Sequence, residues 1–226
     1  MTPETTMTDL STNGSAIQIL ISQGGFAVWL IFLAALVLLV VGAERIITLF
    51  VSMSFNTQSS LENIRARILE KKYTDALQVC NSQPNAPEIS VAKAGLMAVE
   101  NGREAMRSAL AGAVLEVGHK TELRLTYLSL IANVATLLGL LGTISGLIKT
   151  FAAIAKADAA TKATLLGMGI SEAMYATATG LGVGVLAMVV YTVCVTKADE
   201  IVGNAQDVGY KLVTWVEQSE RAATNG

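Results

Sequence analysis

One carboxylate, Glu172, stands alone in the most apolar part of this sequence. It is the single charged residue in the segment from 163 to 195, which is 33 residues long. Ionisable groups are costly inside a membrane, and there they usually mark function. Two interpretations carry equal weight. The carboxyl pairs with a neighbouring helix or reaches the outer interface, or it is a cation or proton site that lines an aqueous path.

Two threonines lie among small residues at helical spacing. Their companions are Gly139, Gly142 and Gly146 around Thr143, and Ala173, Gly180 and Gly184 around Thr177. Small residues let membrane helices approach closely, and a threonine in a helix often donates to the carbonyl four residues earlier. Taken alone, these residues therefore favour helix packing over an ion site. Glu172 does not share a stripe with Thr177, because five residues turn a helix through about 140°.

The composition indicates what kind of element must hold these residues. The chain has 226 residues, of which 15% are charged and 52% apolar, and its mean hydropathy is +0.52. Soluble domains average about 25% charged residues, and a chain of this length cannot enclose so much apolar surface. The low charge excludes disorder, and a net charge of −2 without a basic patch argues against a nucleic-acid partner. The two cysteines are too few for a disulfide scaffold. We therefore expect an integral membrane protein.

Three segments with almost no charge predict three transmembrane helices. They are residues 26–43, 125–148 and 163–195. A helix of about 20 residues crosses a bilayer, and each segment approaches or exceeds that length. The third would be about 50 Å long as a helix, so it must protrude or tilt. A signal peptide would require Lys or Arg before the first segment. None occurs there, so we expect that helix to be retained.

The distribution of Lys and Arg predicts the orientation. None occurs in the first 25 residues, whereas ten occur between residues 44 and 124. Cytoplasmic loops carry the excess of these residues, so the N-terminus is expected outside and the C-terminus inside, with Cys80 and Cys194 reduced. The expected segments are a periplasmic N-terminal segment (1–23), the first transmembrane helix (24–50), a cytoplasmic helical domain (51–124), the second transmembrane helix (125–153), a short periplasmic loop (154–162), the third transmembrane helix (163–195) and a cytoplasmic C-terminal helix (196–226).

The predicted fold class is an all-α membrane protein, with three transmembrane helices extended into a cytoplasmic helical bundle. Residues 81–87 contain two prolines and predict a loop, and Asn101-Gly102 is a weak point between helices. From Arg103 a helix is expected to continue into the second span without a break. The chain has one histidine, His119, no phosphate-binding loop and no metal-ligand spacing. We therefore expect no enzyme activity, no catalytic or metal site and no cofactor.

Two stretches make the sequence recognisable. Residues 135–148 read ATLLGLLGTISGLI and residues 169–181 read GISEAMYATATGL. They resemble the two pore-helix signatures of the ExbB/TolQ/MotA proton-channel family, and Glu44-Arg45 after the first span also fits. The three-span layout is similar to ExbB and TolQ rather than to the four-span flagellar stator subunit. Many ExbB and TolQ members have proline where this chain has Thr136, and ExbB has a second proline where this chain has Leu186. This chain lacks both prolines, so the helix kinks expected from the family are in question.

The resemblance implies a homo-oligomer, expected to be a pentamer, around a pore in a bacterial inner membrane. The pore would hold an ExbD/TolR-like single-span partner that carries a membrane Asp, and lipids would surround the ring. By position, the ion path would run through Thr143 and Thr177, with Glu172 near the outer mouth. The proton motive force would then drive outer-membrane transport or maintenance. Na⁺ remains an alternative to H⁺, because threonine serves either, and a gliding-type stator or a non-conducting scaffold are the alternative functions.

Overall fold

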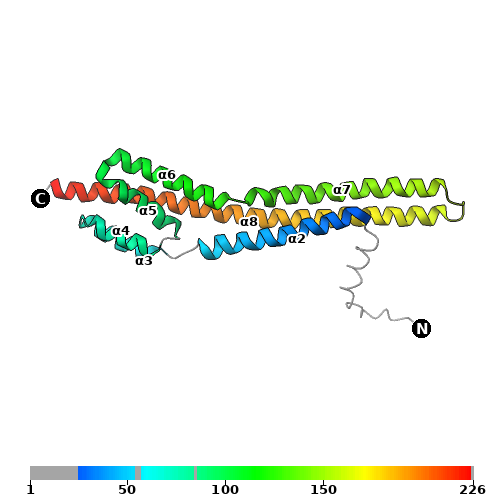
Figure 1. Cartoon of the computed structure of the whole chain (residues 1–226), viewed down its shortest axis with the longest axis horizontal. Coiled ribbons are helices and arrows are strands. Elements are labelled where there is room, and N and C mark those ends of the chain that lie inside the picture. Colours follow the sequence, from blue (N-terminus) through cyan, green and yellow to red (C-terminus); the bar gives the residue numbers. More distant parts are fainter. Residues whose placement is uncertain (1–24, 54–56, 84–85, 225–226) are drawn as a thin grey trace, which may run out of the picture. The chain divides into compact units, whose positions relative to one another are not determined.

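The computed structural model describes residues 25–53, 57–83 and 86–224, and all regular structure in these ranges is helical. Figure 1 shows the helices, which are α2 (Gly25–Ile47), α3 (Gln58–Leu69), α4 (Tyr73–Ser82), α5 (Pro87–Ala98), α6 (Arg103–Glu122), α7 (Leu125–Ala155) and α8 (Lys162–Thr224). A π-helical turn follows α2 (Thr48–Ser52), and a 3₁₀ turn follows α5 (Val99–Asn101).

Three stretches of helix are long and apolar enough to cross a membrane. They are Phe26–Val51, Arg103–Ala155, which is interrupted by a turn at residues 123–124, and Lys162–Arg221. The predicted fold class, all-α with three such helices, is therefore confirmed. The predicted periplasmic segment, residues 1–23, lies outside the described residues. The chain divides into two compact units, which we call the span unit (described residues 25–41 and 127–190) and the bundle unit (42–126 and 191–224).

In the span unit, α7 and α8 pack along a seam of small residues. A Cβ atom added at Gly180 would lie 2.6 Å from the Ala135 carbonyl oxygen and 2.7 Å from the Gly139 Cα. At Gly142 an added Cβ would lie 2.6 Å from the Ala176 Cβ. The two backbones therefore touch, as membrane helices do when only small residues separate them.

The seam contains all five glycines expected to pack helices. Gly139 faces Gly180, and the others face small or hydroxyl-bearing residues, as Gly142 faces Ala176, Gly146 faces Ala173 and Gly184 faces Thr136. The partners run in opposite order along the two helices, so α7 and α8 form an antiparallel hairpin. α2 joins this contact, because an added Cβ at Gly142 would lie 3.0 Å from the Ala27 Cβ.

The bundle unit packs α3 to α6 with the C-terminal part of α8. Its apolar core includes Ile64, Ile68, Ile89 and Leu212, each at most 1% exposed. Ion pairs add to this packing at the surface, where Arg103 pairs with Glu217 and Glu220 of α8. Burial raises the pKa of the Cys80 thiol to about 11, so this free cysteine is protonated and unreactive at neutral pH.

The predicted continuous helix from Arg103 into the second span is wrong, because α6 ends at Glu122 and α7 begins at Leu125. Leu123 is extended (ψ 131°), and Arg124 takes the left-handed conformation (φ 63°) without being glycine. Such a residue costs about 1–2 kcal/mol. An ion pair between the Arg124 guanidinium and the Glu44 carboxylate helps to offset that cost. No glycine or proline marks this position in the sequence, so the pattern gave no sign of a break.

The predicted loop at 81–87 is shorter than expected, whereas the weak point at 101–102 is confirmed. Helix α4 continues through Ser82, and Pro87 is the first residue of α5, where its missing N–H costs nothing. Gly102 has φ 96°, a conformation that glycine adopts without strain.

Arg45 is a charge in a core position of α2. It is 5% exposed, on the same buried stripe as Leu38 and Leu49. Its Nε has no hydrogen-bond partner among the described residues. An unsatisfied buried donor costs about 1–3 kcal/mol, so this end of α2 carries a local cost in stability.

A half-buried carboxyl in the bundle unit predicts a pH-dependent stability. Burial raises the pKa of Glu88, Lys211 lowers it in part, and Thr57 donates a hydrogen bond to its carboxylate. The folded chain therefore keeps this proton to a higher pH than the unfolded chain. Raising the pH through the range above the unfolded carboxyl pKa of about 4.3 should then lower the free energy of unfolding.

Glu88→Gln keeps the size and the acceptor but cannot ionise, so it should lack this part of the pH dependence. The measurement is the melting temperature of the purified protein from about pH 4 to about pH 8. The advantage of the variant over the wild type should grow with pH. An advantage that stays constant across the range would contradict the prediction. Glu62→Gln, on an exposed position of α3, is the control.

Candidate functional site

The structure brings Thr143 of α7 and Thr177 of α8 together across the seam. Their two hydroxyl oxygens are in hydrogen-bond contact, and either can be the donor. Both hydroxyls also lie within donating distance of one acceptor, the Gly139 carbonyl oxygen, at 3.1 Å from Thr143 and 3.2 Å from Thr177. The Thr177 bond crosses between helices, and it exists because the Gly139–Gly180 contact lets the two backbones touch.

This arrangement gathers three oxygens at one point of an apolar helix pair. A threonine hydroxyl carries one donor hydrogen and two acceptor lone pairs, and its hydrogen rotates to suit its partners. Two such hydroxyls beside a carbonyl can hand a proton along or replace part of the water shell of a small cation. We name Thr143, Thr177 and the Gly139 carbonyl the hydroxyl cluster.

The hydroxyl cluster lies beside an apolar face that the rest of the described chain leaves uncovered. Leu140 precedes Thr143 by three residues and is 53% exposed. Met174 and Leu181, which flank Thr177 at helical spacing, are 66% and 48% exposed. Residues three or four apart share a helix face. Another membrane helix can therefore pack against the two threonines.

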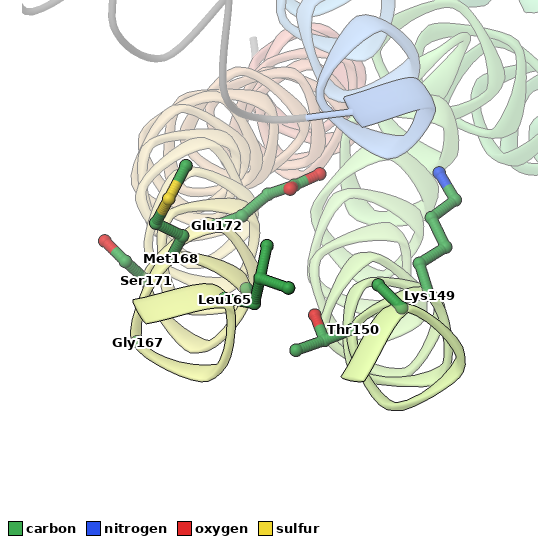
Figure 2. Close-up of a pocket in the computed structure, with 9 residues that line it drawn as sticks. Lys149, Thr150, Leu165, Gly167, Met168, Ser171 and Glu172 are labelled. Carbon is green, nitrogen blue, oxygen red and sulfur yellow. The ribbon is translucent and has the colours of Figure 1, made fainter. Parts of the chain in front are cut away.

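Glu172 does not join the hydroxyl cluster. It lies about 140° round α8 from Thr177, on the other edge of the seam. There it lines an open cavity of about 640 Å³ beside the turn that connects α7 to α8. Figure 2 shows the cavity with Lys149 and Thr150 on α7 and with Leu165, Met168, Ser171 and Glu172 on α8.

One residue of this cavity, Lys149, was not singled out from the sequence. It directly follows the first motif and marked only the end of an uncharged run. Its spacing held a signal, because it follows seam residue Gly146 by three positions, as Glu172 follows seam residue Gly169. Thr150 is buried and donates to the Gly146 carbonyl at 2.8 Å, so its hydrogen points into its own helix.

The two positions without the family prolines lie in unbroken helices. Thr136 donates to the Ala132 carbonyl at 3.0 Å and sits against Gly184, while Leu186 is exposed. Neither α7 nor α8 is interrupted at these points. Among the described residues there is no group of three or more His, Cys, Asp or Glu that could hold a metal ion.

Comparison with known proteins adds one finding. A family model described as the MotA/TolQ/ExbB proton channel family matches residues 83–207, which is more than half of the chain. The matched region contains the hydroxyl cluster, the cavity with Glu172 and the whole of α7. A comparison with curated proteins found no match.

Proposed function

Because the chain belongs to the MotA/TolQ/ExbB proton channel family, we propose that it is the pore-forming subunit of an ion-driven motor in a bacterial inner membrane. Membership makes it a multi-pass membrane protein of a non-enzymatic channel family. The motor would convert the proton motive force into mechanical work for outer-membrane transport or maintenance. One charge that crosses 100 mV releases about 2.3 kcal/mol, so a few ions per step suffice to rearrange a membrane complex.

The observation that carries this proposal is the position of the hydroxyl cluster. Thr143 and Thr177 meet at the edge of an uncovered apolar face, in the middle of a helix pair that the membrane would enclose. A partner helix of the ExbD/TolR type would bring its Asp to this face. A proton on that carboxyl could then exchange with the two hydroxyls without leaving the membrane.

The uncovered face also supports the proposed assembly. Copies of the chain arranged as a ring, which we expect to be a pentamer, would turn these faces toward a central pore and the partner helices. Lipids would cover the remaining apolar surface. In this arrangement the α7–α8 turn and residues 1–23 lie in the periplasm, and the bundle unit and the C-terminus lie in the cytoplasm. Glu172 then sits at the outer end, where it can exchange protons with periplasmic water through its open cavity.

One observation favours a second function, a non-conducting membrane scaffold. The Thr177 hydroxyl bonds the Gly139 carbonyl of the opposite helix, so the hydroxyl cluster also holds α7 and α8 together. In a scaffold, mutation of the cluster would weaken assembly and change no ion flux.

The test measures ion flux through the native complex. The chain is tagged, isolated with its bound partners from its own membrane and placed in phospholipid vesicles that contain a pH-sensitive dye. A pH gradient should drive proton entry into these vesicles. Glu172→Gln should slow entry at least about tenfold, because it removes the carboxylate that takes up protons. Ser171→Ala, the adjacent position, is the control. A wild-type complex that carries its partner but passes no ions would favour the scaffold.

A further inference from the structure

Lys149 shares its cavity with Glu172, and we propose that Lys149 makes this cavity selective for protons over alkali-metal cations. The inference rests on the proposed function, because it requires ions to enter from this end of the hairpin. The family motif in α7 ends before Lys149, so the resemblance assigns it no role. The argument rests on where the ammonium lies and on what a metal cation would need there.

The two charges flank the same side of the helix pair. Gly146 faces Ala173 across the seam, and Thr150 faces Gly169. Lys149 and Glu172 each follow a seam glycine by three residues, and equal offsets in an antiparallel pair place both side chains on one side. Figure 2 shows the Glu172 carboxylate extending from α8 toward α7, with Lys149 rising from α7 on that same side. Both residues line the cavity.

Lys149 cancels the charge that would draw metal cations into the cavity. A lone carboxylate at a channel mouth attracts any cation, which is how acidic rings select cations in other channels. Here the Lys149 ammonium lies in the same cavity and opposes that attraction. Like charges repel more strongly beside low-dielectric protein than in water.

Hydronium meets the same repulsion as a metal cation, but a proton needs only one oxygen once it reaches the cavity. The Glu172 carboxylate takes a proton from hydronium, forming one O–H bond and leaving a water molecule. An alkali cation instead needs several oxygen ligands to replace its water shell. The cavity has few to give, since Thr150 is buried against Gly169 and Ser171 supplies one other side-chain oxygen. Neutralising Glu172 therefore penalises metal ions more than protons.

The test compares ion selectivity in the native complex with that of Lys149 variants. Vesicles carry a pH-sensitive or a sodium-sensitive dye and are exposed to matched H⁺ or Na⁺ gradients. Lys149→Gln should lower the ratio of proton to sodium permeability by at least about tenfold, because the unbalanced carboxylate then attracts Na⁺. Lys149→Arg keeps the charge and should keep the wild-type ratio.

Lys162→Gln is the matched control, because Lys162 begins α8 at the same end of the hairpin without lining the cavity. It should leave the permeability ratio unchanged. A Lys149→Gln complex as proton-selective as the wild type overturns the inference, and so does a Lys162→Gln complex with the same loss of selectivity. A wild-type complex that passes no ions is a different result, which overturns the proposed function itself.

Discussion

Thr177→Val should reduce partner-dependent proton flux about tenfold to a hundredfold while the complex still assembles. Valine has nearly the shape of threonine, but it removes the hydroxyl that contacts Thr143 and donates to the Gly139 carbonyl. Loss of one hydrogen-bonding group from a buried polar site costs about 1–3 kcal/mol, which sets this range of effects. The measurement is dye-reported flux in vesicles that contain the tagged native complex. Thr143→Val should act in the same direction, because the two hydroxyls work as a pair.

Two substitutions separate an ion path from a packing role. Thr177→Ser keeps the hydroxyl and should keep most of the flux. Thr179→Val removes a hydroxyl of the same helix that donates at 2.6 Å to the Tyr175 carbonyl four residues earlier, so it should have little effect. If Thr177→Val lowers the melting temperature or the yield of the oligomer but leaves the flux per complex unchanged, the hydroxyl cluster is a packing feature and the scaffold is the better proposal.

The sequence predicted the helices well because their causes are local. Missing charge marks the spans, and small residues at helical spacing mark the seam between α7 and α8. Both signals follow from membrane burial and helix periodicity, which need no knowledge of the neighbouring chain. The five predicted packing glycines all lie at this seam, where an added Cβ would meet the opposite helix or its small side chains.

Other features could not be predicted because they depend on contacts distant in sequence. The break at Arg124 involves an ion pair with Glu44, which lies 80 residues earlier. That Lys149 and Glu172 line one cavity becomes evident only when the hairpin register is known. The Thr177 hydrogen bond to the Gly139 carbonyl depends on the contact between Gly139 of α7 and Gly180 of α8. The sequence places Glu172 and Thr177 on different faces of one helix, but only the structure shows that an open cavity adjoins the first.

Gly180→Ala should strongly destabilise the span unit. The added Cβ would lie 2.6 Å from the Ala135 carbonyl oxygen and 2.7 Å from the Gly139 Cα. Both obstacles are backbone atoms, so no side-chain rotation can relieve the clash and the helices must separate. Overpacking of this kind costs about 1–3 kcal/mol. The expected results are a lower melting temperature in detergent and weaker proton flux, since separation also breaks the contact that brings Thr177 to Gly139.

Gly182→Ala tests whether that loss comes from the seam rather than from the substitution itself. It lies two residues further along the same helix, and an added Cβ there meets no atom within 4 Å. Alanine in place of glycine at an open helical position favours the helix by about 1 kcal/mol, so Gly182→Ala should leave the melting temperature unchanged or raise it. Equal destabilisation by both variants would show that the backbones do not touch at Gly180. The geometry that creates the hydroxyl cluster would then be wrong, since Thr177 reaches the Gly139 carbonyl only across that contact.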